Sequence, residues 1–171
     1  LRSGKLTSGP KTETFQQIFS KKIKTKNSLL VNSGSSANLL ALQCLINPYR
    51  KKRLKKGDEV LIPALCWSTS LWPIVQSGLK PKFVDVDVDT LNFNLKELEK
   101  KITKKTKAIL VVHVLGNCPN MDQLMKIKKK YNLLLIEDTC ESLGTRYKNK
   151  YLRTIRLNVL SFQGEGVLGF W

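Results

Sequence analysis

Hydrophobic residues recur along the chain at two different spacings, which predict two kinds of element. Apolar positions three or four residues apart, such as Phe15, Ile18, Phe19 and Ile23, are typical of a helix with one buried face. Short apolar runs bounded by polar or turn-forming residues are typical of buried strands. By these criteria we expect helices over 12–26, 37–47, 68–77, 95–102 and 122–131, strands over 28–31, 59–62, 82–86, 108–114 and 133–136, and a small hairpin over 145–151.

Strands and helices alternate along most of the chain, which predicts an α/β fold with a mostly parallel sheet and helices on both faces. The run Ile109–Val112 is apolar at every position, as expected for a strand buried on both faces. In such sheets ligands bind at the carboxyl ends of the strands. The predicted strand ends are rich in polar, aromatic and glycine residues, so we expect a site there. These segments are 32–36, 63–68, 113–117 and 137–144.

The length and composition suit an ordinary globular domain. The chain has 171 residues, of which 42% are hydrophobic and 25% charged, and this excludes an intrinsically disordered protein. No apolar run approaches the roughly 20 residues that a membrane helix needs, and the first residues lack the pattern of a signal peptide. We therefore expect a cytoplasmic protein with no membrane partner. Because residue 1 is Leu, we also expect the chain to begin inside a longer reading frame.

The formal net charge of +17 favours anionic partners, but the distribution of the lysines matters more. Most basic residues fall on expected helix surfaces or in loops, and no aromatic residues alternate with them as a base-stacking surface would require. The main interpretation is a set of solvated helix faces, with no nucleic acid as partner. Attraction of an anionic small molecule such as a nucleotide sugar is one alternative, and nucleic-acid binding through charge alone is another. The basic segments are 21–26, 50–56, 100–107 and 126–130.

The cysteines do not predict a metal site. Cys44, Cys66, Cys118 and Cys140 are isolated from one another, and a single histidine, His113, cannot complete a Cys/His site. We expect no metal, and we interpret the cysteines as small hydrophobic residues of a reducing compartment. His113 has two interpretations, a core or strand-end histidine and a contact to substrate or cofactor.

Three groups of residues near predicted strand ends carry candidate chemistry. Gly34, Ser35 and Ser36 begin a helix, where N–H groups, hydroxyls and the helix dipole favour an anion, although a plain helix cap is the alternative. Trp67 follows a strand and would stack on a planar ligand or pack as a core or interface aromatic. Asp138 follows a buried strand and would accept a hydrogen bond from a protonated heterocycle, or act as a cap or loop ion pair.

Together these residues provide the contacts that pyridoxal phosphate needs. They form a phosphate cradle, a stacking ring and a carboxylate that keeps the pyridine nitrogen protonated, so that the ring acts as an electron sink. Glu141 lies three residues after Asp138, and one turn of helix would place both carboxylates on the same side.

Five sequence runs resemble the DegT/DnrJ/EryC1/StrS family of sugar aminotransferases, in the family's order and between about residue 4 and about residue 154. They are VNSGSSANLLAL (31–42), GDEVLIP (57–63), GLKPKFVDVD (78–87), TKAI (106–109) and LLIEDTCESLG (134–144). The resemblance implies the aspartate-aminotransferase-like fold (fold type I), here as an incomplete large domain. It also implies pyridoxal 5'-phosphate or pyridoxamine 5'-phosphate as cofactor, a nucleotide-linked keto sugar as substrate, and a homodimer. The family's enzymes serve O-antigen and other surface polysaccharide biosynthesis, and an aminotransferase would use a donor such as glutamate.

The resemblance also implies roles for individual residues. Ser35 and Ser36 would hold the cofactor phosphate, Trp67 would cover the ring, and Asp138 would meet the pyridine nitrogen. Glu141 would lie near the cofactor oxygen. The runs around 32–38, 113–117 and 137–141 are most similar to the subgroup of CDP-4-keto-6-deoxyglucose 3-dehydrases. In that subgroup a histidine replaces the Schiff-base lysine, and C3 deoxygenation replaces transamination.

The chain departs from the family pattern near its last residues. Ser161 and Phe162 resemble the family's Ser-Phe pair, which makes Ser161 a candidate phosphate ligand, but the position five residues after Ser161 is Gly166 rather than lysine or histidine. No lysine or histidine follows Lys150, so we expect no catalytic residue in this chain.

The expected organisation is a partial cofactor-binding domain over 1–154, with an N-terminal helix and arm over 1–27. We expect 155–171 to be an aberrant or truncated segment and the C-terminal small domain to be absent. A binding domain without catalysis and a basic nucleic-acid-binding protein are the competing hypotheses.

Overall fold

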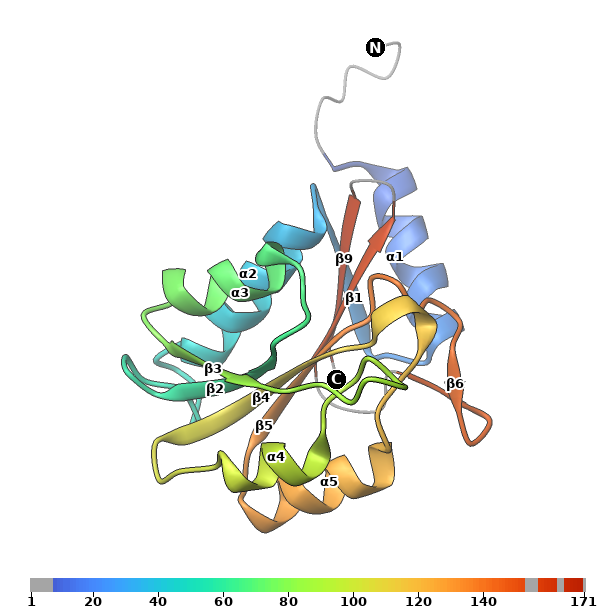
Figure 1. The fold of residues 1–171 in the computed structure, drawn as a ribbon. Helices are drawn as coiled ribbons and strands as arrows, with labels where there is room; N and C mark the ends of the chain where they lie inside the picture. The colour runs from blue at the N-terminus through green and yellow to red at the C-terminus, as the bar shows by residue number, and fades with distance from the viewer. Residues whose placement is uncertain (1–7, 153–156, 163–164, 171) are drawn as a thin grey trace.

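A twisted sheet with helices on both faces forms the body of the molecule (Figure 1). The computed structural model describes residues 8–152, 157–162 and 165–170. The helices are α1 (Pro10–Ile23), α2 (Gly34–Ile46), α3 (Ser68–Gln76), α4 (Leu95–Lys100), the 3-10 turn η1 (Val114–Gly116) and α5 (Met121–Lys130). The strands are β1 (Asn27–Val31), β2 (Glu59–Pro63), β3 (Lys80–Val84), β4 (Thr106–Val112), β5 (Leu134–Asp138), β6 (Arg146–Tyr147), β7 (Lys150–Tyr151), β8 (Leu157–Phe162) and β9 (Glu165–Phe170).

Within the described residues the main sheet has seven strands in the order β1-β9-β8-β5-β4-β2-β3. Strand β9 runs antiparallel to its neighbours β1 and β8, whereas the β8-β5, β5-β4, β4-β2 and β2-β3 pairs are parallel. Six strands therefore point the same way, and their carboxyl ends lie along one edge. This confirms the predicted α/β fold with a mostly parallel sheet.

The central strand β4 is buried on both faces, as its apolar run predicts. Ala108 and Leu110 face a core that includes residues of α2 and α3, whereas Ile109 and Val111 face a second core beneath α4 and α5. Figure 1 shows the two helix pairs on opposite sides of the sheet. Each apolar square ångström removed from water in these two layers contributes roughly 25 cal/mol, so this packing is the main stabilising term.

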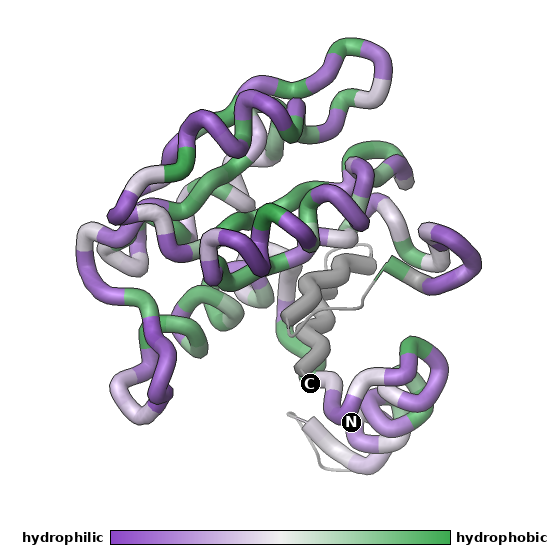
Figure 2. Tube along the Cα trace, turned by 90° about the horizontal axis from the view of Figure 1, so that it is seen from below, coloured by the Kyte–Doolittle hydropathy of each residue, from purple (hydrophilic) through white to green (hydrophobic). Residues whose placement is uncertain are grey.

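Helix α5 illustrates how a helix attaches its apolar side to the sheet. Asn120 caps the start of the helix, since its side chain accepts a hydrogen bond from the Gln123 N–H. Lysines at 128–130 lie in the last turn, where the helix dipole favours cations. Met121, Leu124 and Ile127 are buried at a spacing of three residues. Figure 2 shows the matching alternation of hydrophilic and hydrophobic residues along the helices nearest the viewer.

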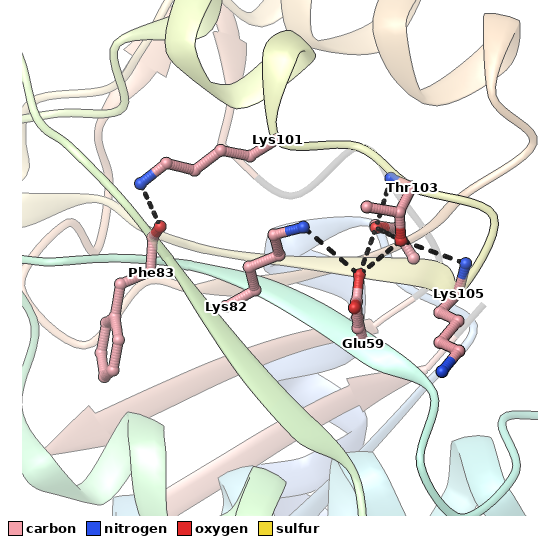
Figure 3. Close-up of polar contacts among 7 residues, drawn as sticks. Glu59, Lys82, Phe83, Lys101, Thr103 and Lys105 are labelled. Carbon is pink, nitrogen blue, oxygen red and sulfur yellow. Dashed lines mark hydrogen bonds and ion pairs between the residues drawn. The ribbon is translucent and has the colours of Figure 1, made fainter.

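The amino ends of β2, β3 and β4 are joined by a polar cluster around Glu59 (Figure 3). One Glu59 oxygen, Oε2, accepts hydrogen bonds from the hydroxyls of Thr103 at 2.6 Å and Thr106 at 3.0 Å, and Lys82 Nζ lies 3.6 Å from the same oxygen. Lys101 Nζ donates to the Phe83 carbonyl at 2.8 Å. The cluster connects the first residues of β2 and β4 with the middle of β3.

Two expected strands begin two residues earlier than the sequence indicated. Strand β3 covers 80–84 rather than 82–86, and it includes Pro81 because an edge strand tolerates a residue without an N–H. Strand β4 covers 106–112 rather than 108–114, because Thr106 already pairs with Glu59 and the chain turns into η1 after His113.

The last part of the chain forms strands. β8 and β9 pair with each other and insert between β5 and β1. Two strands therefore follow one another without a helix, and both belong to the main sheet, within the segment 155–171 that we expected to be aberrant or truncated. The small hairpin turns at Lys148 and Asn149, both with positive φ, between β6 and β7. In the part of the chain that is described, every helix is too short or too polar to cross a membrane.

Leu110→Ala should lower the free energy of unfolding by about 2–5 kcal/mol, because Leu110 is fully buried in the central strand and its loss leaves a cavity. Urea unfolding followed by circular dichroism measures this. The control Lys107→Ala removes an exposed side chain of the same strand and should change the value by less than about 0.5 kcal/mol. Equal effects of the two substitutions would contradict the two-sided burial of β4.

Glu59→Gln should destabilise the protein at neutral pH and much less in acid. The hydrogen bond from Thr103 is the main cause that lowers the pKa of Glu59, with Thr106 and Lys82 adding to it and burial opposing it. Because the pKa of Glu59 is lower in the folded protein, its ionised carboxylate stabilises the folded state at pH values above the unfolded pKa of about 4.3. This stabilisation is lost as the pH falls through the folded pKa.

Urea unfolding at about pH 7 and about pH 3.5 tests this, and the difference between wild type and Glu59→Gln should shrink in acid. Glu13→Gln, at an exposed carboxylate of α1, is the matched control. A pH-independent difference for Glu59→Gln would show that the carboxylate charge does not contribute.

Candidate functional site

Three segments that are far apart in the sequence meet at the carboxyl edge of the sheet. They are the start of α2 (33–38), the start of α3 (67–70) and the end of β5 with its following turn (138–141), and we call them together the carboxyl-edge site. Hydrogen bonds connect all three. Asn38 of α2 and Ser70 of α3 both contact Asp138, and Trp67 contacts Glu141.

Asp138 is the central residue of this site. It is the last residue of β5 rather than a residue just past the expected strand 133–136, because its backbone still pairs with Val112 of β4 and Val159 of β8. Its side chain faces α2 and α3 and its relative exposure is 3%. One oxygen, Oδ2, accepts hydrogen bonds from Asn38 Nδ2 and Ser70 Oγ, both at 2.9 Å, and Oδ1 accepts one from the Cys140 N–H at 3.2 Å.

The side chain of Asp138 accepts its hydrogen bonds from neutral donors, which are Asn38, Ser70 and the Cys140 N–H. None of the ion pairs among the described residues involves Asp138. Burying a carboxylate is costly unless it is paired and hydrogen-bonded, and neutral donors leave its negative charge in place. The site is therefore electrostatically suited to a cationic group that approaches Asp138.

The start of α2 has the geometry of an anion site and of a helix cap at once. Ser33 is the cap, since its Oγ accepts from the Ser36 N–H at 3.1 Å and donates to Ser36 Oγ at 3.0 Å. Ser35 is exposed, and Gly34 is the first residue of the helix. The positive end of a 13-residue helix thus faces solvent at Gly34 and Ser35, while Ser36 is partly engaged by the cap.

Trp67 and Glu141 lie against each other at the rim. The indole is 69% exposed, and its Nε1 donates to Glu141 Oε1 at 3.3 Å. The expected helical turn between Asp138 and Glu141 is wrong, because residues 139–145 form turns. Glu141 Oε2 instead accepts the N–H of Leu115 at 2.7 Å, a residue with φ of 51°. The Glu141 carboxylate therefore connects Trp67, at the start of α3, with Leu115 of η1.

The remaining candidates have other positions. Ser161 lies in β8 opposite Gly166, and its side chain lies outside the described part of the structure. His113 is fully buried, and its Nε2 lies 3.1 Å from Glu137 Oε2 on the opposite side of the sheet from Asp138. This geometry favours the core interpretation of the histidine. Among the described residues, no group of three His, Cys, Asp or Glu side chains is arranged to hold a metal ion.

Sequence reasoning missed Asn38 and Ser70, although both left a signal. Asn38 is a polar residue on the face of α2 that otherwise buries Ala37, Ala41 and Leu42. Ser70 lies four residues before the buried Ile74 and so shares its side of α3. A polar residue at a core position of a helix needs a partner, and here the partner is Asp138.

Burial and the negative charge of Asp138 raise the pKa of two nearby thiols, Cys66 and Cys140. Burial raises the pKa of Cys66, and the negative charge of Asp138 raises it further. The same two causes, in the same order, raise the pKa of Cys140 far above its usual range, helped by a hydrogen bond to Asp138. A raised pKa lowers the thiolate fraction of both cysteines at neutral pH and so makes them weaker nucleophiles.

The family model described as DegT/DnrJ/EryC1/StrS aminotransferase family matches residues 1–169. The chain is 43% identical over 157 residues to "GDP-4-keto-6-deoxy-D-mannose 3-dehydratase" of Escherichia coli O55:H7, with 92% of this chain and 40% of the relative covered. It is 43% identical over 152 residues to "Lipopolysaccharide biosynthesis protein RfbH" of Salmonella typhimurium, with 88% and 35% covered.

A solved structure is similar over nearly the whole chain. This is GDP-4-keto-6-deoxymannose-3-dehydratase "with a trapped PLP-glutamate geminal diamine", with a TM-score of 0.90 and 37% identity. It matches 99% of this chain but only 46% of its own chain. The chain thus spans less than half the length of these relatives, and the likeness confirms the expected fold type.

Asp138→Asn should speed the alkylation of Cys66 by iodoacetamide at pH 8 by roughly two- to fivefold. Removing the carboxylate charge removes one cause of the raised pKa, so more of the thiol is thiolate at that pH. Residue-specific mass spectrometry measures the rate. Cys44 is the internal control, because its pKa is raised by burial and lowered by Arg50. Equal acceleration of Cys44 and Cys66 would indicate general loosening instead.

Proposed function

The chain belongs to the DegT/DnrJ/EryC1/StrS aminotransferase family, and we propose that it binds pyridoxal 5'-phosphate or pyridoxamine 5'-phosphate at the carboxyl-edge site. The observation that carries the proposal is the buried Asp138 carboxylate, which has neutral hydrogen-bond donors and no ion pair among the described residues. Such a carboxylate suits a protonated pyridine nitrogen. When bound, the cofactor supplies a cationic ring that withdraws electrons from a carbon atom next to its exocyclic nitrogen.

Each part of the site has a place in this proposal. Gly34 and Ser35 would hold the phosphate at the start of α2, with Ser36 contributing the part of its hydroxyl that Ser33 leaves free. Trp67 would cover one face of the ring from the rim. Glu141 would fix the edge of Trp67, in addition to the expected contact near the cofactor oxygen. Ser161 remains a proposed phosphate ligand from β8.

For the full-length protein we propose chemistry on a nucleotide-linked keto-deoxy sugar in surface polysaccharide biosynthesis. Transamination with a donor such as glutamate and C3 dehydration are the two candidate reactions. The names of the relatives favour dehydration, since a curated 3-dehydratase is 43% identical and a solved 3-dehydratase matches 99% of this chain. The proposal includes a homodimer in the cytoplasm, which the half-exposed apolar residues Trp72 and Val75 on α3 support as a surface for a second copy.

This chain by itself should bind the cofactor without a covalent bond. Strand β8 ends at Phe162 and β9 begins at Glu165, so two residues connect the strands. The sequence after Lys150 has neither lysine nor histidine. This stretch therefore contains neither a lysine that could form the Schiff base nor a histidine in its place. We propose that the 171-residue chain binds the cofactor without turnover.

Pyridoxamine phosphate is the suitable probe, because its amine cannot form Schiff bases with the many surface lysines. We expect saturable binding, measured by calorimetry and by quenching of tryptophan fluorescence. Asp138→Asn should weaken it by at least about tenfold, since the ring nitrogen loses its anionic partner. Asp122→Asn, at an exposed carboxylate of α5, should leave the affinity unchanged. No saturable binding by the wild-type chain would overturn the proposal.

A further inference from the structure

Two neutral side chains determine how Asp138 presents its charge. Asn38 Nδ2 and Ser70 Oγ both donate to Asp138 Oδ2 at 2.9 Å, from two different helices. Each of the two donors is 1% exposed, so water does not compete with them. Neither residue lies where the phosphate or the ring face is expected. Because both donate to the same oxygen, they fix the orientation of the Asp138 carboxylate.

The orientation of the Asn38 amide is fixed by its surroundings. Its Nδ2 also approaches the Thr69 carbonyl at 3.4 Å, so the NH2 group faces two acceptors, and a flipped amide would place oxygen against both. Thr69 O is available because the residue four positions on is Pro73, inside α3, which has no N–H to donate. Asn38 Oδ1 is buried without a hydrogen-bond partner among the described residues.

The acceptor positions of Asp138 can then be counted. An ionised carboxylate offers about four acceptor positions, two on each oxygen. Asn38 and Ser70 fill Oδ2, and the Cys140 N–H takes one position on Oδ1 at 3.2 Å. The thiol of Cys140 also hydrogen-bonds to Asp138, but a thiol is a weak donor. A position on Oδ1 is therefore open to a stronger donor such as a cationic N–H group.

We propose that Asn38 and Ser70 are positioning residues that occupy Oδ2 of Asp138 and direct Oδ1 to the protonated ring nitrogen of the cofactor. The site thereby selects a charged heterocycle over a neutral ring of the same shape. This inference rests on the proposed function, because it concerns the same ligand. It adds the acceptor atom and the two residues that determine the selection.

The test compares two probes that differ at one atom. Pyridoxamine phosphate has the ring nitrogen, and its carbocyclic analogue has a C–H group in that place. The ratio of their dissociation constants should be about tenfold or more in favour of pyridoxamine phosphate in the wild-type chain. Ser70→Ala and Asn38→Leu should each reduce the ratio at least threefold, whereas Ser70→Thr, which keeps the hydroxyl, should preserve it. Calorimetric titration measures both constants.

Ser35→Ala is the matched control, since it should weaken both probes by the same factor and leave their ratio unchanged. A purely structural role of Asn38 and Ser70 would also weaken both probes equally. Wild-type ratios in Ser70→Ala and in Asn38→Leu would overturn this inference and leave the proposed function standing. If Asn38→Leu does not fold, Ser70→Ala alone decides. Failure of the wild-type chain to bind pyridoxamine phosphate would overturn both.

Discussion

The burial of one carboxylate at the end of an apolar strand is the constraint on which the site depends. Strand β5 brings Asp138 to the carboxyl edge with 3% of its surface exposed, and water is therefore replaced by protein donors. Those donors come from α2, α3 and the turn after β5. Asn38 and Ser70 lie near the starts of these two helices, so both helices begin close to the same carboxylate oxygen.

A comparison with Glu59 shows how the surroundings of the two carboxylates differ. Glu59 lies at the amino edge, has hydroxyl donors from Thr103 and Thr106, and keeps Lys82 within 3.6 Å (Figure 3). Its charge is compensated inside the protein. Asp138 has a similar set of neutral donors but no ion pair among the described residues. The parallel strands thus carry a compensated carboxylate at one edge and an uncompensated one at the other.

Most of the fold and part of the site could be predicted from the sequence. Periodicity located the five α-helices and the strands β1 to β5, because buried strands and amphipathic helices leave apolar patterns that need no tertiary information. It did not locate β8 and β9, since we expected 155–171 to be an aberrant or truncated segment. The start of β3 was missed because only its position at the sheet edge makes Pro81 acceptable. Glu141 was placed near Asp138 through a helix that does not form, and its link to Trp67 depends on a pairing 74 residues apart in the sequence. Asn38 and Ser70 were missed because they lie in helices and their partner, Asp138, is contributed by a strand that is distant in the sequence.

Pro73 shows how an interruption in one helix becomes part of another element's bonding. In a regular helix each backbone carbonyl accepts a hydrogen bond from the N–H four residues on. The carbonyl of Thr69 lacks this bond because Pro73 has no N–H. The amide of Asn38 reaches this carbonyl and Asp138 together, so the backbone of α3 acts as a second anchor for a side chain of α2. Pro73 therefore leaves open a carbonyl that helps to orient the amide of Asn38. Substitutions at 73 would change the site without changing any residue that lines it.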